Sequence, residues 1–161
     1  LEDFFTPDYL YDFFSELYGI PTDRRDARKR MLFARFGIQE FAQVRVRDLS
    51  TGMKQKVSLV ISLVQDPEII IFDEPTNGLD ILTAKVVTDF LLDLKEQGKT
   101  IIVSTHIFSL VEKICDRVGI IINGRMAACE DLWTLCGDQS LEDRFFEIYE
   151  AVNGEEENHD K

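Results

Sequence analysis

The segment EIIIFDEPTNGLD, residues 68–80, decides the fold of this chain. Its apolar run, residues 69–72, is short and unbroken, which is typical of a strand buried on both faces of a parallel sheet. Asp73 and Glu74 follow at the carboxyl end of that strand, which is the edge where open α/β sheets bind ligands. A proline and an Asn-Gly pair then end the strand and turn the chain. Taken alone, the segment is equally compatible with a buried strand that leads into a polar turn.

Two further motifs flank this segment. Upstream, residues 49–56 read LSTGMKQK, and downstream, residues 100–106 read TIIVSTH, a second apolar strand with a histidine at its end. In their order and spacing, the three segments resemble the second half of an ATP-binding cassette (ABC) ATPase: signature motif, Walker B strand, D-loop and switch histidine. The resemblance covers essentially the whole chain, so we expect ATP and Mg²⁺ as its cofactors.

The resemblance assigns roles to residues at the ends of the two strands. Glu74 would be the catalytic base that orients the attacking water, and Asp73 would hold Mg²⁺ through water. Adjacent side chains alternate across a strand, so one carboxylate can serve the metal and the other the water. His106 would reach the γ-phosphate. A lone histidine is usually structural, as we expect for His159, but His106 directly follows an apolar strand and Ser104-Thr105.

The signature segment is predicted to open a helix. A helix N-terminus with free N–H groups, a serine hydroxyl and a glycine is an anion site, so Ser50, Thr51 and Gly52 are the candidate phosphate contacts. The resemblance implies that this phosphate belongs to ATP on a second ATPase subunit in a head-to-tail dimer, and it adds Asp80 of the D-loop to the nucleotide site. The usual LSGGQ reads LSTGM here, so residue 53 is a methionine and no glutamine side chain is available there.

One apparent phosphate-binding motif is a decoy. Gly98-Lys99-Thr100 matches the end of a P-loop, but position 93 is Asp where the pattern needs Gly, and a predicted helix precedes it where a strand is required. We interpret it as a helix cap followed by a strand. Because these 161 residues contain no other P-loop pattern, we expect the chain to be a fragment without Walker A and Q-loop, and to be inactive alone.

Composition limits the possible classes of protein. With 161 residues and 45% hydrophobic content, the chain can bury a sizeable core. The net charge of -12 argues against nucleic-acid binding. Ten of the eighteen basic residues lie between Arg24 and Lys56, which we interpret as a solvated helical face in preference to a phosphate- or membrane-facing patch. No apolar run approaches the roughly 18 residues of a membrane span. Cys115, Cys129 and Cys136 lack metal-type spacing and are expected to be reduced thiols.

The pattern predicts an α/β fold, a partial P-loop NTPase whose RecA-like parallel sheet is preceded by a helical subdomain. The expected parts are a helical subdomain (1–66), half of the RecA-like core (67–129), C-terminal helices (130–152) and a disordered acidic tail (153–161). Predicted helices cover residues 7–18, 23–36, 52–65, 82–97, 107–115, 131–136 and 141–152. Residues 38–42 are expected to form a helical turn, 44–48 an extended link, and 118–122 with 125–128 a hairpin about Asn123-Gly124.

The first predicted helix, residues 7–18, is unusually aromatic. Tyr9, Phe13 and Leu17 lie along one side at helical spacing, and Leu10, Phe14 and Tyr18 lie beside them. Core packing explains most of this surface, but its width leaves room for a partner to cover part of it. We expect Tyr11 to lie on the exposed face, where a substitution would test such a contact.

The favoured function is the ATP-hydrolysing subunit of an ABC transporter that resembles the ABC-2 exporter branch. It would act on a membrane-spanning permease subunit from the cytoplasm, as a peripheral protein on the inner face of the membrane. Two alternatives remain open. One is a soluble ABC-type ATPase of translation or DNA repair, which the negative charge disfavours. The other is a non-catalytic remnant that serves as a regulatory or binding module.

Overall fold

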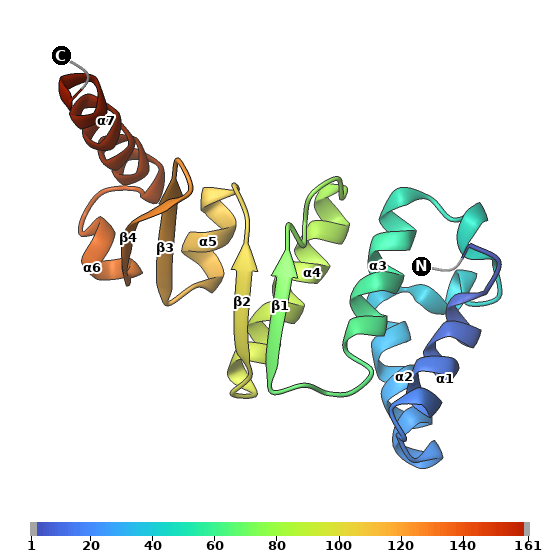
Figure 1. Ribbon diagram of the computed structural model, residues 1–161. Coiled ribbons are helices and arrows are strands. Elements are labelled where there is room, and N and C mark those ends of the chain that lie inside the picture. Colours follow the sequence, from blue (N-terminus) through green and yellow to red (C-terminus); the bar gives the residue numbers. More distant parts are fainter. Residues whose placement is uncertain (1–2, 160–161) are drawn as a thin grey trace. The chain divides into compact units, whose positions relative to one another are not determined.

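The chain forms two compact units, Leu1–Ser104 and Thr105–Lys161, which are described in turn. The structure is a computed structural model, and it describes residues 3–159, with side chains up to Gly154. The first unit contains α1 (Pro7–Leu17), α2 (Thr22–Phe36), η1 (Ile38–Phe41), η2 (Val46–Asp48), α3 (Thr51–Ser62), β1 (Ile69–Asp73), α4 (Ile81–Glu96) and β2 (Thr100–Ser104) (Figure 1). The second contains α5 (Phe108–Ile114), β3 (Arg117–Ile122), β4 (Arg125–Asp131), α6 (Leu132–Cys136) and α7 (Leu141–His159).

The ends of the first helices are set by their capping residues, as the sequence predicts. The Thr6 hydroxyl accepts a hydrogen bond from the Tyr9 N–H at 3.2 Å, and Pro7 occupies the first helical position. Helix α2 ends at Gly37, whose φ of 66° is the left-handed conformation that glycine adopts at low cost. The predicted extended link is partly wrong, because Val46–Asp48 forms one turn of 3₁₀ helix.

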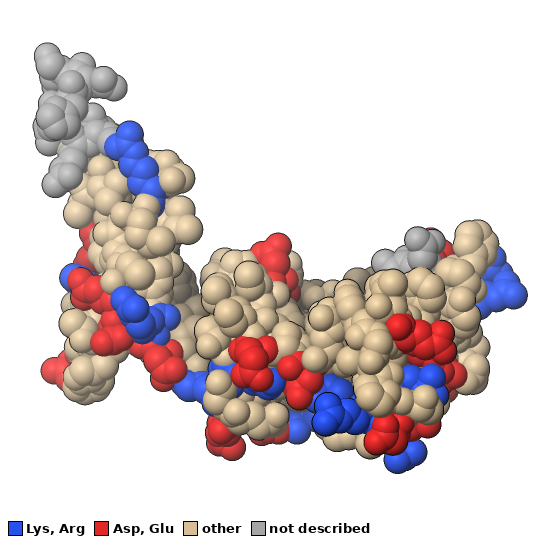
Figure 2. All heavy atoms as spheres, turned by 60° about the horizontal axis from the view of Figure 1, so that its bottom comes forward, with Lys and Arg blue, Asp and Glu red and all other residues tan. Residues whose placement is uncertain are grey.

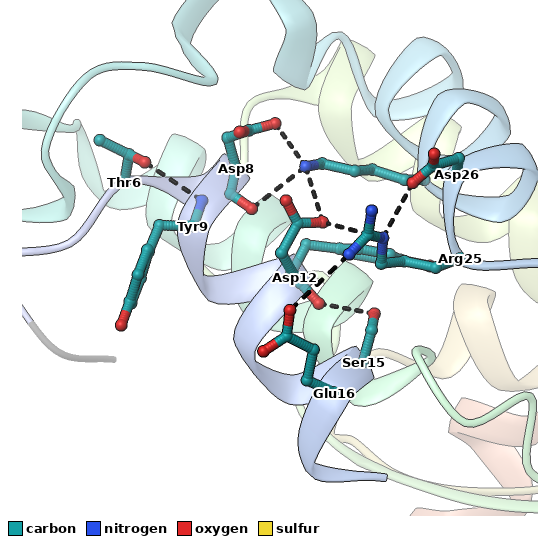
Figure 3. Close-up of polar contacts among 10 residues, drawn as sticks. Thr6, Asp8, Tyr9, Asp12, Ser15, Glu16, Arg25 and Asp26 are labelled. Atoms are coloured by element: carbon teal, nitrogen blue, oxygen red, sulfur yellow. Dashed lines mark hydrogen bonds and ion pairs between the residues drawn. The ribbon is translucent and has the colours of Figure 1, made fainter. Parts of the chain in front are cut away.

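An ion-pair network joins α1 to α2 (Figure 3). The Lys29 ammonium lies 2.5 Å from the Asp8 carboxylate and 3.0 Å from that of Asp12. Arg25 lies 2.8 Å from Asp26 and 3.5 Å from Asp12. Because Asp12 contacts both basic residues, the network fixes the face of α1 that is turned toward α2.

Much of the basic segment is therefore paired with acidic side chains. Arg28 lies 2.9 Å from Asp66, and Arg35 contacts Asp93 of α4. Figure 2 shows basic and acidic side chains intermingled over the helical lobe, α1 to α3. This supports the interpretation of residues 24–56 as a solvated, ion-paired surface and not as a single-sign patch.

Apolar side chains of α1, α2, α3 and α4 form the core of the first unit. The rings of Tyr11 and Phe33 meet edge to face at 5.6 Å, and those of Phe36 and Phe90 at 5.1 Å. The other buried members include Leu10, Leu32, Val57, Val60, Leu63, Val64, Val87, Leu91 and Leu94. These contacts attach the signature-bearing helix α3 and the helix α4 to one common core.

Tyr11 belongs to that core, so its predicted place on the exposed face is wrong. Its side chain is 1% exposed, and burial raises its pKa to about 12. Its hydroxyl has no hydrogen-bond partner among the described residues. An unpaired buried hydroxyl carries a desolvation cost of about 1–3 kcal/mol.

We therefore expect Tyr11→Phe to leave the melting temperature of the chain unchanged or to raise it. Tyr11→Ala, which removes the whole ring, should lower the free energy of unfolding by about 3–5 kcal/mol. Thermal and urea denaturation measure both effects. A marked loss of stability in Tyr11→Phe would show that the hydroxyl is hydrogen-bonded in solution.

Strands β1 and β2 pair in parallel, with Ile69 opposite Thr100 and Asp73 opposite Ser104. Burial alternates along β1: Ile70 and Phe72 are buried, whereas Ile69 and Ile71 are 62% and 73% exposed. Within the described residues only one face of the strand is covered, so the prediction of burial on both faces is wrong here. The exposed face nevertheless carries β-branched apolar side chains, including Ile102 of β2.

The decoy motif lies at the start of the strands. Gly98 has a φ of 81° and follows α4, as a helix cap does. The Lys99 ammonium lies 3.1 Å from the Asp66 carboxylate and 3.3 Å from that of Glu68. Lys99 therefore ties together the segments that lead into β1 and β2, at the end opposite Asp73 and Ser104. This confirms the prediction of a helix cap followed by a strand.

The second unit is a hairpin packed with helices. β3 and β4 pair antiparallel across Asn123-Gly124, both with positive φ, which confirms the predicted hairpin. Its core consists of Ile120, Ile122, Leu135 and Leu141. The Glu112 carboxylate accepts a hydrogen bond from the Leu141 N–H at 2.8 Å and so holds the start of α7.

Helix α7 is longer than the sequence predicts. It runs to His159, whereas the helix was expected to end at Val152 and residues 153–161 to be disordered. The backbone of residues 153–159 therefore differs from that prediction, and residues 160–161 lie outside the described ones. Glutamates are good helix formers, which accounts for the continuation. Among the described helices, none has the length and apolarity to cross a bilayer.

Candidate functional site

The carboxyl ends of β1 and β2 bring two acidic residues and a serine together. The Ser104 hydroxyl donates a hydrogen bond to the Asp73 carboxylate across the strand pair. The Glu74 N–H donates to the Ser104 carbonyl oxygen at 2.9 Å. Asp73 and Glu74 are thus both attached to one residue of the neighbouring strand.

Glu74 has an unusual backbone conformation. Its φ is 47°, in the left-handed region, which costs a residue with a side chain roughly 1–3 kcal/mol. Such strain concentrates at functional sites, where the surrounding structure holds it in place. The residue that the sequence analysis assigns as the catalytic base is therefore held in a strained conformation at the end of β1.

The donor set at this edge suits Mg²⁺ better than a metal that needs a full protein cage. The described residues contain no group of three or more His, Cys, Asp or Glu side chains able to hold a metal. Mg²⁺ is usually bound by one or two carboxylates, with water and phosphate oxygens as its other ligands. Asp73, whose carboxylate is exposed at the strand end, is the residue that would hold it.

The signature segment begins α3. Ser50 is its N-cap, and the serine hydroxyl accepts a hydrogen bond from the Met53 N–H at 3.3 Å, which leaves the hydroxyl proton for another acceptor. Thr51 is exposed, and Gly52 is half-buried. A Cβ on Gly52 would lie 3.9 Å from the Leu79 side chain, an ordinary contact. The start of α3 therefore lies beside the loop that leads into α4.

Asp80 has a structural role that the sequence analysis did not consider. It is the N-cap of α4: Oδ1 accepts from the N–H groups of Leu82 and Thr83 at 3.0 Å each, and Oδ2 accepts from the Thr83 hydroxyl at 2.7 Å. The side-chain hydrogen bond from Thr83, followed by the backbone ones, lowers the pKa of Asp80. The carboxylate is therefore ionised and engaged within its own chain.

A cavity of about 200 Å³ opens between α3 and the end of β1. Gln55, Ser58 and Ser62 of α3 line one side of it, and Phe72, Asp73 and Pro75 line the other. Its walls are partly polar. Asp73 is accessible from this cavity, which places the candidate metal residue at a hollow and not on a flat surface.

Six of the predicted site residues lie in the first unit. Ser50, Thr51 and Gly52 start α3; Asp73 and Glu74 end β1; Asp80 starts α4. His106 is exposed and belongs to the second unit, two residues after Ser104.

Sequence reasoning missed Ser104 as a site residue. Ser104 is the last residue of β2, as Asp73 is the last residue of β1, and parallel strands place their carboxyl ends at the same sheet edge. The position of Ser104 at the end of the second apolar run could therefore have indicated that it lies near Asp73.

Comparison with known proteins shows what this chain is similar to. The ABC transporter family matches residues 4–77. The ABC transporter ATP-binding protein NatA of Bacillus subtilis is 39% identical over 131 residues, 81% of this chain and 53% of the relative. The Nod factor export ATP-binding protein I of Ralstonia nicotianae is 36% identical over 134 residues, 80% of this chain and 40% of the relative.

A solved structure of an ATP-binding subunit of an ABC transporter superposes with a TM-score of 0.86 and 28% identity. It covers 92% of this chain and 64% of that one. The fold is therefore that of an ABC ATP-binding subunit, as the sequence predicts. The chain spans about half the length of the curated relatives it matches, or less.

Proposed function

We propose that this chain, which matches the ABC transporter family over residues 4–77 and is similar to ABC transporter ATP-binding proteins, is the signature and Walker B part of an ATPase subunit that drives a membrane permease. The observation that carries the proposal is the strand-end arrangement of Asp73, strained Glu74 and Ser104, with a glycine-containing helix start in the same unit. Phosphoryl transfer relies on positioning and charge neutralisation; the arrangement would supply the positioning, and a Mg²⁺ ion held by Asp73 would supply the neutralisation.

In this proposal each residue has a defined part. Glu74 orients and deprotonates the attacking water, and Asp73 would hold Mg²⁺, which would neutralise charge on the phosphates when bound. His106 contacts the γ-phosphate. Ser50, Thr51 and Gly52 offer the N-terminus of α3 to ATP on a second ATPase subunit in a head-to-tail dimer. Asp80 belongs to the proposed nucleotide site. It lies at the start of α4, where its carboxylate also caps the helix.

The chain by itself is expected to bind ATP more weakly than micromolar and not to hydrolyse it. In P-loop enzymes, most contacts to the β- and γ-phosphates come from the loop N–H groups and its lysine, and the lysine of the decoy motif is engaged at the other end of the strands. Titration with Mg-ATP by calorimetry measures the binding. Adding a separately made N-terminal segment that contains a P-loop should restore binding and turnover, and tight binding by the chain alone would overturn the proposed site.

The proposed permease contact is the aromatic face of α1, which is exposed. Tyr9, Phe13 and Leu17 are 49%, 47% and 64% exposed. The rings of Phe5 and Tyr9 stack at 4.6 Å, and those of Tyr9 and Phe13 lie 6.2 Å apart, so the face is a continuous row. Exposed aromatic rows of this kind are typical of protein interfaces.

Phe13→Asp is expected to weaken co-purification with a membrane-spanning partner and to leave the melting temperature unchanged, because the ring is exposed. Met31→Asp on α2, which is 49% exposed, is the matched control and should not affect association. A loss of stability with unchanged association would show that the aromatic face serves only the fold.

We place this subunit in the cytoplasm, on the inner face of the membrane, because its proposed partner spans the bilayer and its ATP is cytoplasmic. The homologues include export ATP-binding proteins, which favours the exporter branch. Neither alternative, an ATPase of translation or DNA repair or a non-catalytic module, is favoured by the relatives reported above.

A further inference from the structure

Ser104 makes one hydrogen bond to each of the two acidic residues at the end of β1. Its hydroxyl donates to Asp73 Oδ1, and its carbonyl oxygen accepts from the Glu74 N–H at 2.9 Å. The register of the parallel pair places Ser104 opposite Asp73.

We propose that Ser104 is the positioning residue of the site: its hydroxyl holds the Asp73 carboxylate in the orientation that receives Mg²⁺. The inference rests on the proposed function, since it assigns the metal to Asp73. It adds to that function a residue of the neighbouring strand β2, which contacts Asp73, the residue proposed to hold the metal, and not the metal itself.

The physical reason is the freedom of an exposed carboxylate. Asp73 is exposed, so packing does not fix its side-chain torsions. A hydrogen bond to Oδ1 selects one rotamer and leaves Oδ2 for a water ligand of the metal. Outer-shell hydrogen bonds of this kind are worth about 10–100-fold in metal affinity.

A purely structural role for the hydroxyl is a poor explanation of the contact. The strand pair is held by backbone hydrogen bonds along five paired positions, which a side-chain change leaves in place. The Ser104 side chain lies on the exposed face of the sheet, beside Ile102, where it fills no core space. Deleting its hydroxyl therefore removes the contact with Asp73 and little else.

The test compares Ser104→Ala with Ser104→Thr, which keeps a hydroxyl and suits a strand. Thr100→Ala, on the same exposed face at the other end of β2, is the control. Mn²⁺ is titrated into the chain and followed by electron paramagnetic resonance. In parallel, hydrolysis by the chain combined with a P-loop-containing segment is measured against Mg²⁺ concentration.

We expect Ser104→Ala to weaken Mn²⁺ binding about tenfold and to raise the half-saturating Mg²⁺ concentration by a similar factor. Ser104→Thr and Thr100→Ala should match the unchanged chain in both measurements. All variants, combined with the P-loop-containing segment, should bind ATP equally well in the absence of metal. Equal metal dependence in Ser104→Ala and the unchanged chain would overturn the positioning role. Absence of hydrolysis in the unchanged combination would instead count against the proposed function, and the Mn²⁺ titration would still decide the role of Ser104.

Discussion

Replacing Glu74 with glutamine is expected to lower ATP hydrolysis by about 10²–10⁴-fold while ATP binding is retained. The substitution keeps the shape of the side chain and the backbone bond to Ser104, but it removes the carboxylate that we propose accepts the proton of the attacking water. The measurement is steady-state phosphate release and ATP affinity, with the chain combined with a P-loop-containing N-terminal segment.

Glu68→Gln is the matched control for this experiment. Glu68 immediately precedes β1 and pairs with Lys99, so Glu68→Gln also removes one carboxylate charge, but at the opposite end of the same strand. The hydrolysis rate of Glu68→Gln should stay within a few-fold of that of the unchanged protein. A rate of that order in Glu74→Gln as well would remove Glu74 from the mechanism.

Gly52→Ala is expected to separate folding from activity. Nothing in the fold requires glycine there, because a Cβ would meet only the Leu79 side chain at an ordinary 3.9 Å. Alanine favours a helix over glycine by up to about 1 kcal/mol, so the chain should be as stable or slightly more stable. A methyl group would, however, stand between the start of α3 and an approaching phosphate.

A displacement of the order of 1 Å at a reacting group can reduce a rate about a hundredfold, and we expect a loss of that order in the ATPase dimer that we propose. Thermal denaturation and ATP hydrolysis, measured on the same preparation, give both quantities. Lys56→Ala, on α3 and outside the cavity beside Asp73, is the control for changes to this helix. Full activity in Gly52→Ala would show that no phosphate approaches this position closely.

The parts of the fold that sequence predicted well are those governed by local chemistry. Thr6 with Pro7, Gly37, and Asn123-Gly124 define their helix ends and hairpin through backbone preferences that depend on few neighbours. The apolar runs of β1 and β2 likewise predicted their strands and their parallel pairing.

The parts that sequence missed depend on contacts between distant segments. Tyr9 and Tyr11 are two residues apart and therefore lie on opposite sides of α1, but aromatic residues occur on both sides, and only the packing of α2 shows that Tyr11 is buried and Tyr9 exposed. The bond from Ser104 to Asp73 depends on strand register, which the apolar runs do not specify. The apolar character of Ile69 and Ile71 indicates that they favour burial, but it does not show whether the described residues cover them, and both are exposed.

The left-handed backbone of Glu74 has a consequence for laboratory evolution of this protein. Glycine adopts that conformation with little strain, so Glu74→Gly would gain stability at the position proposed to carry the chemistry. A library selected for heat resistance alone would therefore enrich folded variants without the base. Selection for ATP turnover would favour glutamate at this position. In rounds that alternate the two selections, the frequencies of glutamate and glycine at position 74 would measure the strength of each.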